Sequence, residues 1–204
     1  NINNIFSEET SNFISSKNGM IKWLDINNDG FLDVIVTGEN NLNEPIAKLY
    51  QNNRNGEFFE YLNHNIVPVK NSTISLEDYN KDGYTDILIL GNDGEQRLSK
   101  IYKNDKDSLI DIDASLINVD WADAAWADID NDGSLDFIIS GADKDLDIQI
   151  NGNSISIHTG NTREKQGYRY IGNDEFEAIS KSTTNGNSYG SLDFGDYDND
   201  GDDD

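Results

Sequence analysis

The segment "DINNDGFLDVIVTG", Asp25–Gly38, joins an acidic loop directly to an unbroken apolar run. The same arrangement recurs as "DYNKDGYTDILILG" (Asp78–Gly91) and "DIDNDGSLDFIISG" (Asp128–Gly141), and the loop alone recurs as "DYDNDGDDD" (Asp196–Asp204). All four loops share D-x-[DN]-x-D-G-x-x-D, and their first aspartates are 53, 50 and 68 residues apart. Such repetition indicates that one supersecondary unit is copied along the chain. It also makes "DYDNDGDDD" a fourth loop rather than a solvated acidic tail.

Each loop is flanked by patterns typical of β-strands. Before the loops, apolar residues recur at every second position, as in Ile21 and Trp23 or Ala124 and Trp126. This period predicts a strand with one buried face, and therefore places both tryptophans in the core. The runs "VIVTG", "ILILG" and "FIISG" that follow the first three loops are unbroken and rich in β-branched residues. They predict a second strand that is buried on both faces.

Two more strand patterns complete each unit. The third strand is expected in "AKLYQNN", "SKIYKND" and "YRYIGND", and the fourth in "EFFEYL", "SLIDID" and "EFEAIS". Four short strands in about 50 residues is the size of a β-propeller blade. Blades stacked around an axis would cover both faces of the second strand. A linear β-solenoid is the alternative, although its rungs are usually shorter.

We therefore expect one all-β domain over residues 1–204, built from propeller blades of four antiparallel strands. The expected blades cover residues 18–64, 71–115 and 120–181, followed by a truncated blade at 188–204. The third contains an insert at 145–165, where two alternating runs flank Asn151-Gly152, a strong signal for a two-residue hairpin. In a propeller this hairpin would project from the face opposite the acidic loops.

The charge of the chain restricts its partners. Its 204 residues carry 39 acidic and 15 basic side chains, a formal net charge of −24. Such a surface repels phosphate backbones and anionic lipid, so we expect no nucleic-acid partner and no insertion into a membrane, whereas cations are favoured. The chain has no cysteine and starts without methionine or a signal peptide, and we expect it to be part of a larger chain. Neither His64 nor His158 lies beside a nucleophile motif, so we expect no enzymatic activity and no catalytic residue.

The loop pattern is that of a hard-cation site. Positions 1, 3, 5 and 9 supply side-chain oxygens, position 7 can supply its carbonyl, and the glycine at position 6 permits a sharp turn. Ca²⁺ takes about 6–8 such oxygens, whereas Mg²⁺ demands stricter octahedral geometry. An EF-hand is excluded because position 12 is Val36, Ile89 or Ile139 inside a strand, where an EF-hand has a glutamate. Solvated polar turns remain the alternative without a metal.

The loops and their flanking strands resemble FG-GAP/VCBS repeats, the blades of integrin-α-like β-propellers. The phrase "AAWADIDNDGSLDFIISG" is especially similar to the version found in secreted proteins of Bacteroidetes-type bacteria. The resemblance extends from about Asn18 to Asp204 and implies a propeller of typically seven blades. It also implies a secreted or cell-surface location, calcium at the first-to-second strand turns, and a role in adhesion or ligand recognition.

Transferred residue by residue, the resemblance implies up to four calcium sites, one per loop, and the last is expected to be the one left empty, because no strand follows Asp204 to hold it in place. The expected ligands are Asp25, Asn27, Asp29, the Phe31 carbonyl and Asp33; Asp78, Asn80, Asp82, the Tyr84 carbonyl and Asp86; Asp128, Asp130, Asp132, the Ser134 carbonyl and Asp136; and Asp196, Asp198, Asp200, the Asp202 carbonyl and Asp204. The third site offers four carboxylates against three in the first two, so it is expected to bind more tightly than they do.

Three functions remain open at this point. The chain could be an adhesion or recognition module for an extracellular protein or glycan. It could instead be the non-catalytic propeller of a secreted polysaccharide-degrading enzyme, or a structural spacer in a surface protein.

Overall fold

The chain folds as three four-stranded antiparallel sheets. The computed structural model describes residues 12–106, 108–150, 153–179 and 190–195, and this part of the chain contains twelve strands and no helix. The strand orders are β1-β2-β3-β4, β5-β6-β7-β8 and β12-β11-β10-β9, so each sheet is a meander of consecutive strands. The all-β prediction is confirmed, and the three sheets are consistent with propeller blades.

The strand bounds follow the repeat. The first sheet contains β1 (Ile21–Leu24), β2 (Asp33–Glu39), β3 (Pro45–Asn52) and β4 (Phe58–Glu60). The second contains β5 (Lys70–Glu77), β6 (Asp86–Asn92), β7 (Arg97–Asn104) and β8 (Leu109–Asp111). The third contains β9 (Asp120–Ala127), β10 (Asp136–Ile150), β11 (Asn153–Gly172) and β12 (Glu175–Ala178).

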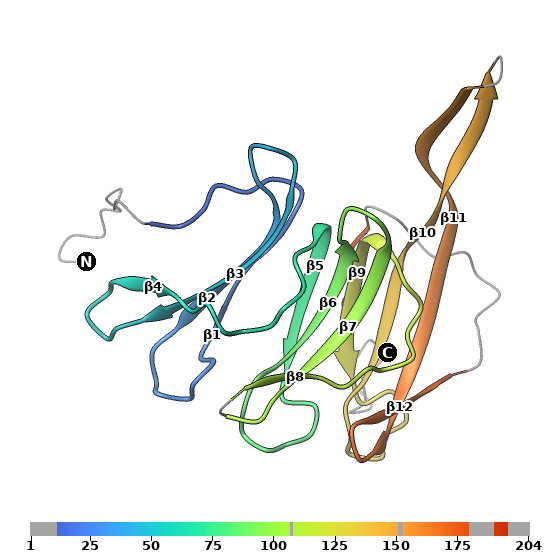
Figure 1. Cartoon of the computed structure of the whole chain (residues 1–204). Helices are drawn as coiled ribbons and strands as arrows, with labels where there is room; N and C mark the ends of the chain where they lie inside the picture. The colour runs from blue at the N-terminus through green and yellow to red at the C-terminus, as the bar shows by residue number, and fades with distance from the viewer. Residues whose placement is uncertain (1–11, 107, 151–152, 180–189, 196–204) are drawn as a thin grey trace.

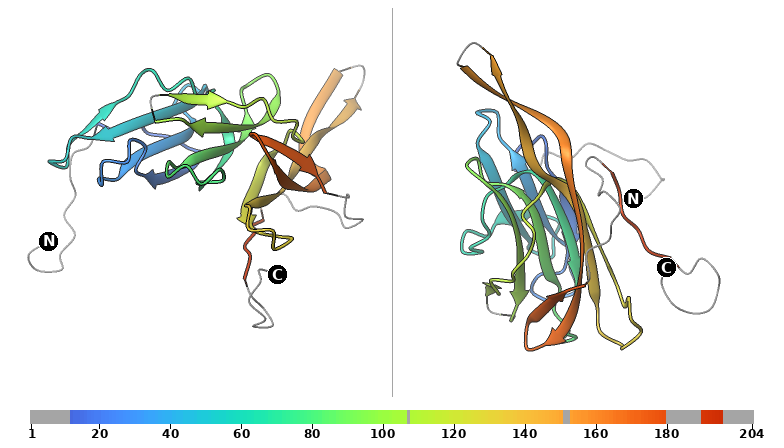
Figure 2. Two further views of the ribbon diagram at one scale, coloured as in Figure 1. Left: turned by 90° about the horizontal axis from the view of Figure 1, so that it is seen from below. Right: turned by 90° about the vertical axis from the view of Figure 1, so that its right-hand side faces the viewer.

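The three sheets follow one another in space as they do in sequence (Figures 1 and 2). The first strands of neighbouring sheets contact each other, β1 with β5 and β5 with β9. In each sheet the acidic loop joins the first strand to the second, and the three loops lie at the same end of the molecule (Figure 1). This arrangement places the three loops side by side.

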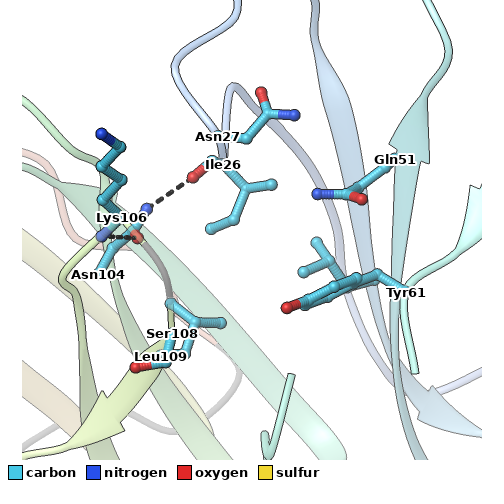
Figure 3. Close-up of a pocket in the computed structure, with 9 residues that line it drawn as sticks. Ile26, Asn27, Gln51, Tyr61, Asn104, Lys106, Ser108 and Leu109 are labelled. Carbon is cyan, nitrogen blue, oxygen red and sulfur yellow. Dashed lines mark hydrogen bonds between the residues drawn. The ribbon is translucent and has the colours of Figure 1, made fainter. Parts of the chain in front are cut away.

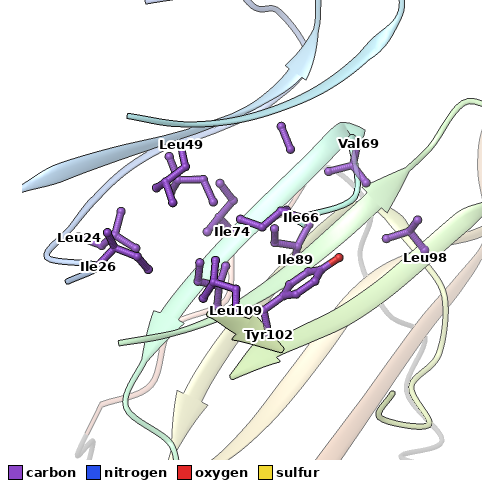
Figure 4. Packing of buried hydrophobic residues seen from close by; sticks show 13 residues of the cluster. Leu24, Ile26, Leu49, Ile66, Val69, Ile74, Ile89, Leu98, Tyr102 and Leu109 are labelled. Atoms are coloured by element: carbon purple, nitrogen blue, oxygen red, sulfur yellow. The ribbon is translucent and has the colours of Figure 1, made fainter. Parts of the chain in front are cut away.

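The core consists of two apolar layers, one on each side of the second sheet. Ile87 and Ile89 of β6 belong to the layer against the first sheet, which Figure 4 shows in close-up. Leu88 and Leu90, which alternate with them, belong to the layer against the third sheet. All four side chains have 0 % exposure. The unbroken apolar run is therefore explained by a strand with a neighbouring sheet on both faces.

A tyrosine of each third strand ties the sheet to the segment that precedes it. The hydroxyls of Tyr50, Tyr102 and Tyr168 accept hydrogen bonds from the backbone N–H groups of Ile14 (3.0 Å), Val67 (3.0 Å) and Ile117 (2.7 Å), respectively. The donors Ile14, Val67 and Ile117 are 53 and 50 residues apart, the same spacing as the first aspartates of the three loops. Residues that precede the first sheet thus occupy the place that the inter-sheet connections occupy in the second and third sheets.

The outer face of the first sheet differs from the sequence prediction. Trp126 packs, as expected, in the apolar layer between the second and third sheets. By contrast, the equivalent Trp23 is 54 % exposed, and Ile21 on the same face is 60 % exposed. Phe13 and Ile14 cover Val34, Val36 and Tyr50 on that face. The prediction for Trp23 is wrong because its face has no neighbouring sheet among the described residues, whereas the equivalent face of the third sheet packs against the second.

The insert of the third unit lengthens β10 and β11. The two strands stay paired from Phe137↔Tyr168 out to Ile150↔Asn153, with register shifts on both sides of Lys144. The extension leaves the sheet at the end opposite the acidic loops (Figure 1). The described residues of the expected fourth unit, 190–195, contain no strand, and the backbone N–H of Leu192 donates to Asp123 Oδ2 at 2.7 Å.

Candidate metal centre

The first position of each acidic loop organises the turn. Both carboxylate oxygens of Asp78 accept hydrogen bonds from the backbone, one from Asp82 N at 3.0 Å and one from Gly83 N at 2.8 Å. Asp25 and Asp128 make the same two bonds to the fifth and sixth positions of their own loops, at 2.7–3.0 Å. The three loops therefore share one hydrogen-bonded frame, which draws positions 1 and 5 together.

The third and fifth positions add bonds of the same kind to the backbone two residues further along the chain. Asp82 Oδ1 accepts from Tyr84 N at 2.9 Å, and Asn80 Oδ1 accepts from Asp82 N at 2.9 Å. The equivalent bonds occur in the first and third loops. Gly83, at position 6, has a φ of 90°, in the region that favours glycine. Each aspartate at these positions uses one oxygen in the turn, which leaves its second oxygen for another partner.

The ninth position is a buried carboxylate that links the loop to the sheet. Asp33, Asp86 and Asp136 are 0–1 % exposed. Asp136 accepts from Ile129 N of its own loop at 3.2 Å and from Tyr170 N of β11 at 2.9 Å. Asp33 accepts the equivalent pair, from Ile26 N at 3.1 Å and from Asn52 N at 2.8 Å. This aspartate therefore anchors the loop to the third strand.

Because these carboxylates are buried, their ionised form needs a nearby positive charge to be stable. Burial raises the pKa of Asp33 and of Asp136, and raises that of Asp86 to about 7, with nearby Asp82 and Asp78 adding repulsion. The Oδ2 atom of Asp86 is buried and has no hydrogen-bond partner. A cation beside this atom would satisfy the oxygen and relieve the repulsion. The all-oxygen set is also what calcium prefers.

The structure brings three expected ligands of the third loop together, whereas the carboxylates of the first two loops share the hydrogen-bonded frame without forming such a group among the described residues. Asp128, Asp130 and Asp136 offer oxygens that all lie within 4.8 Å of one another, the one group of three found in the described part of the chain. Phe31, Tyr84 and Ser134 occupy the expected seventh positions of their loops. The expected fourth set, Asp196, Asp198, Asp200, Asp202 and Asp204, lies outside the described residues.

The comparison with protein families follows the same loops. The sequence model of the FG-GAP-like repeat family matches the chain twice, over residues 25–89 and 78–139. Each match starts at the first aspartate of one loop and ends in the second strand of the next sheet.

The chain belongs to the FG-GAP-like repeat family.

Searches among curated proteins and among solved structures returned no match. Nor do the described residues of this FG-GAP-like repeat protein include a helix of the length and hydrophobicity that a membrane span requires.

Hydrogen bonds also join the loops of successive FG-GAP-like units, which the sequence analysis missed. Asn28, at position 4 of the first loop, donates to the Gly83 carbonyl of the second at 3.1 Å. Lys81, at position 4 of the second loop, donates to the Gly133 carbonyl of the third. The only sequence signal is a polar residue at position 4 of every loop.

Two arginines contact the proposed ligands, and the sequence analysis missed them as well. Arg54 Nε lies 3.2 Å from Asp29 Oδ2 of the first loop, and Arg169 Nη1 lies 3.1 Å from Asp130 Oδ2 of the third. Arg169 also lines an open hollow of about 470 Å³ beside Asp132 and Ser134. Neither arginine belongs to the loop motif, so motif spacing could not reveal them.

A small cavity lies between the first and second sheets, near the loop end (Figure 3). It has a volume of about 40 Å³, and its lining includes Ile26, Tyr61 and Asn104. Asn104 Nδ2 closes one side by donating to the Ile26 carbonyl at 2.8 Å. A space of this size holds a few water molecules at most. The cavity is therefore part of the packing between sheets and too small for an organic ligand.

Proposed function

We propose that this FG-GAP-like repeat chain is a calcium-binding, extracellular β-propeller module that recognises a protein or glycan ligand and has no catalytic activity of its own. The observation that carries the proposal is the convergence of Asp128, Asp130 and Asp136 on one point in the third loop. The same hydrogen-bonded frame in the first two loops supports one calcium ion per loop.

Calcium is favoured over other cations by the donors. The loops offer carboxylate, amide and carbonyl oxygens and no histidine or cysteine. Soft metals prefer nitrogen and sulfur donors, and Mg²⁺ needs a more regular octahedron than a loop of mixed donors provides. Asp128, Asp130, Asp132 and Asp136 would hold the ion in the third loop, where it would neutralise carboxylates that otherwise repel.

An extracellular location agrees with the exposure and charge of the loops. Extracellular calcium modules work at dissociation constants of roughly 10⁻⁴–10⁻³ M, a range that exposed sites with few carboxylates can reach. Position 3 of the first two loops is an asparagine, Asn27 or Asn80, which limits each loop to three carboxylates. A net charge of −24 also disfavours nucleic acid as a partner.

The lengthened β10–β11 hairpin is the proposed recognition element. It projects from the end opposite the acidic loops, so a ligand bound there would not compete with calcium (Figure 1). In the second sheet, the equivalent connection is the short turn Asp93–Gln96 between the paired residues Asn92 and Arg97. Elements that extend beyond a rigid scaffold commonly carry binding functions.

Shortening this hairpin tests the proposed recognition. Grafting Asp93–Gln96 in place of residues 143–162 would close β10 and β11 at the Ala142↔Arg163 pair, as in the second sheet. We expect ligands found on glycan and extracellular-protein arrays to bind the shortened chain roughly tenfold or more weakly, because anchoring contacts are lost. The melting temperature in calcium is the control and should change little. Unchanged binding by the shortened chain would contradict the assignment of this surface.

A further inference from the structure

The arginines at the first and third loops take the carboxylate oxygen that a metal would use. In Asp29, Oδ1 accepts from Phe31 N at 3.0 Å, and Oδ2 lies 3.2 Å from Arg54 Nε. In Asp130, Oδ1 accepts from Asp132 N at 3.3 Å, and Oδ2 lies 3.1 Å from Arg169 Nη1. In both loops the turn uses one oxygen and a guanidinium pairs with the other. A calcium ion and the arginine would therefore compete for the same atom.

Each arginine is held in place by a second contact. The Arg54 guanidinium carbon lies 5.8 Å from the ring centre of Phe31, and Arg169 Nη2 lies 3.3 Å from Glu177 Oε2. The two side chains are 62 % and 45 % exposed. They can therefore swing into solvent without disturbing the core when an ion enters.

The second loop has the same two cationic positions but without these pairs. Lys106 is equivalent to Arg54, since the N–H of each donates to the side chain of the asparagine two residues before it. Lys106 forms no ion pair with a loop carboxylate within the described part of the chain, and it lines the small inter-sheet cavity. Lys103 is equivalent to Arg169, and its ammonium binds Asp174 Oδ2 at 2.8 Å.

The third loop also receives a second positive charge from its neighbour. Lys81 of the second loop reaches the Gly133 carbonyl of the third, whereas the equivalent contact into the second loop comes from the neutral amide of Asn28. The third loop therefore contacts two cationic side chains, Arg169 and Lys81, and the first loop contacts one, Arg54. Within the described residues, no cationic side chain is bonded to the expected ligands of the second loop. A count of carboxylates alone would instead predict the tightest calcium binding in the third loop.

From these contacts we infer that Arg54 and Arg169 are internal competitors of calcium, which lower the affinity of the first and third loops so that the second loop fills first. The inference rests on the proposed function, because it assumes that the loops bind calcium. Each guanidinium contacts the carboxylate oxygen that the ion would use, in Asp29 and in Asp130. Calcium binding then requires them to leave, which adds a cost that the second loop does not have.

A calcium titration of the ¹⁵N-labelled chain followed by NMR resolves the loops. The amides of Gly30, Gly83 and Gly133 each donate to the first aspartate of their loop, at 2.7, 2.8 and 2.8 Å, so each reports on one site. In the wild type, Gly83 should respond at the lowest calcium concentration. Arg54→Gln should lower the calcium midpoint of Gly30, and Arg169→Gln that of Gly133, by roughly 3- to 10-fold, without moving Gly83.

A matched variant separates this effect from a general change in charge. Lys48→Gln removes one positive charge that pairs with Glu60 and touches no loop, and it should leave all three midpoints nearly unchanged. Arg54→Lys keeps the charge and should stay close to the wild type. The inference is overturned if both arginine variants behave like Lys48→Gln, or if Gly133 responds before Gly83. If none of the three glycine amides responds to calcium in the wild type, the proposed calcium binding itself is contradicted.

Discussion

Removal of calcium is expected to lower the melting temperature of the chain by on the order of 20 °C. Each site filled at about 100 times its dissociation constant adds roughly 2.7 kcal/mol to stability. Three such sites give about 8 kcal/mol, and 1 kcal/mol corresponds to roughly 2–4 °C for a chain of this size. The physical reason is the cluster of carboxylates in each loop, including the buried Asp33, Asp86 and Asp136, which repel one another without a cation.

The measurement is thermal unfolding by circular dichroism in excess CaCl₂ and in excess EGTA. Excess MgCl₂ in place of CaCl₂ is the control, and it should protect much less because of its stricter geometry. Equal melting temperatures in calcium and EGTA would mean that the ions have no structural role.

Truncation of Phe137 is expected to be the most damaging single change in the core. Phe137 has 0 % exposure, and its ring centre lies 4.7 Å from Trp126, 5.0 Å from Tyr168 and 5.1 Å from Phe176. Phe137→Ala should therefore cost about 3–5 kcal/mol, from lost apolar burial and the cavity left behind.

A surface phenylalanine provides the matched comparison. Phe59 is 60 % exposed, and Phe59→Ala should change stability by less than about 0.5 kcal/mol. Urea unfolding in excess calcium measures both variants. Similar losses in the two variants would show that the layer between the second and third sheets is not the main source of stability.

The elements of each unit could be predicted because the information that defines them is local and repeated. The apolar run from Ile87 to Leu90 predicts a strand with two buried faces, and its four side chains are fully buried. The loops are equally local, since the Asp78 carboxylate accepts hydrogen bonds from backbone groups four and five residues later. Repetition at 53 and 50 residues then extends each assignment to the neighbouring unit.

The features that the sequence did not predict depend on the contacts of a sheet with its surroundings. Trp23 and Trp126 occupy equivalent positions, yet only Trp126 packs against a neighbouring sheet. The insert is another example, because its hairpin signal did not indicate that β10 and β11 would be extended by the insert and pair, across two register shifts, out to Ile150↔Asn153.

The ion pairs of the loops were missed for a related reason. Arg54 and Arg169 come from outside the motif, 25 and 39 residues from the aspartates they contact. Their partners depend on how the third strand and its following turn lie beside the loop. A linear pattern does not contain such contacts, so it could not reveal these ion pairs.

The most direct test of the calcium assignment is a crystal structure of this chain grown with excess CaCl₂ and measured for anomalous scattering. The account predicts one anomalous peak in each of the first three loops, within about 2.3–2.6 Å of the side-chain oxygens of positions 1, 3, 5 and 9. It also predicts that Arg54 and Arg169 no longer contact Asp29 and Asp130. Loops without anomalous density at saturating calcium, with both arginine pairs intact, would contradict it.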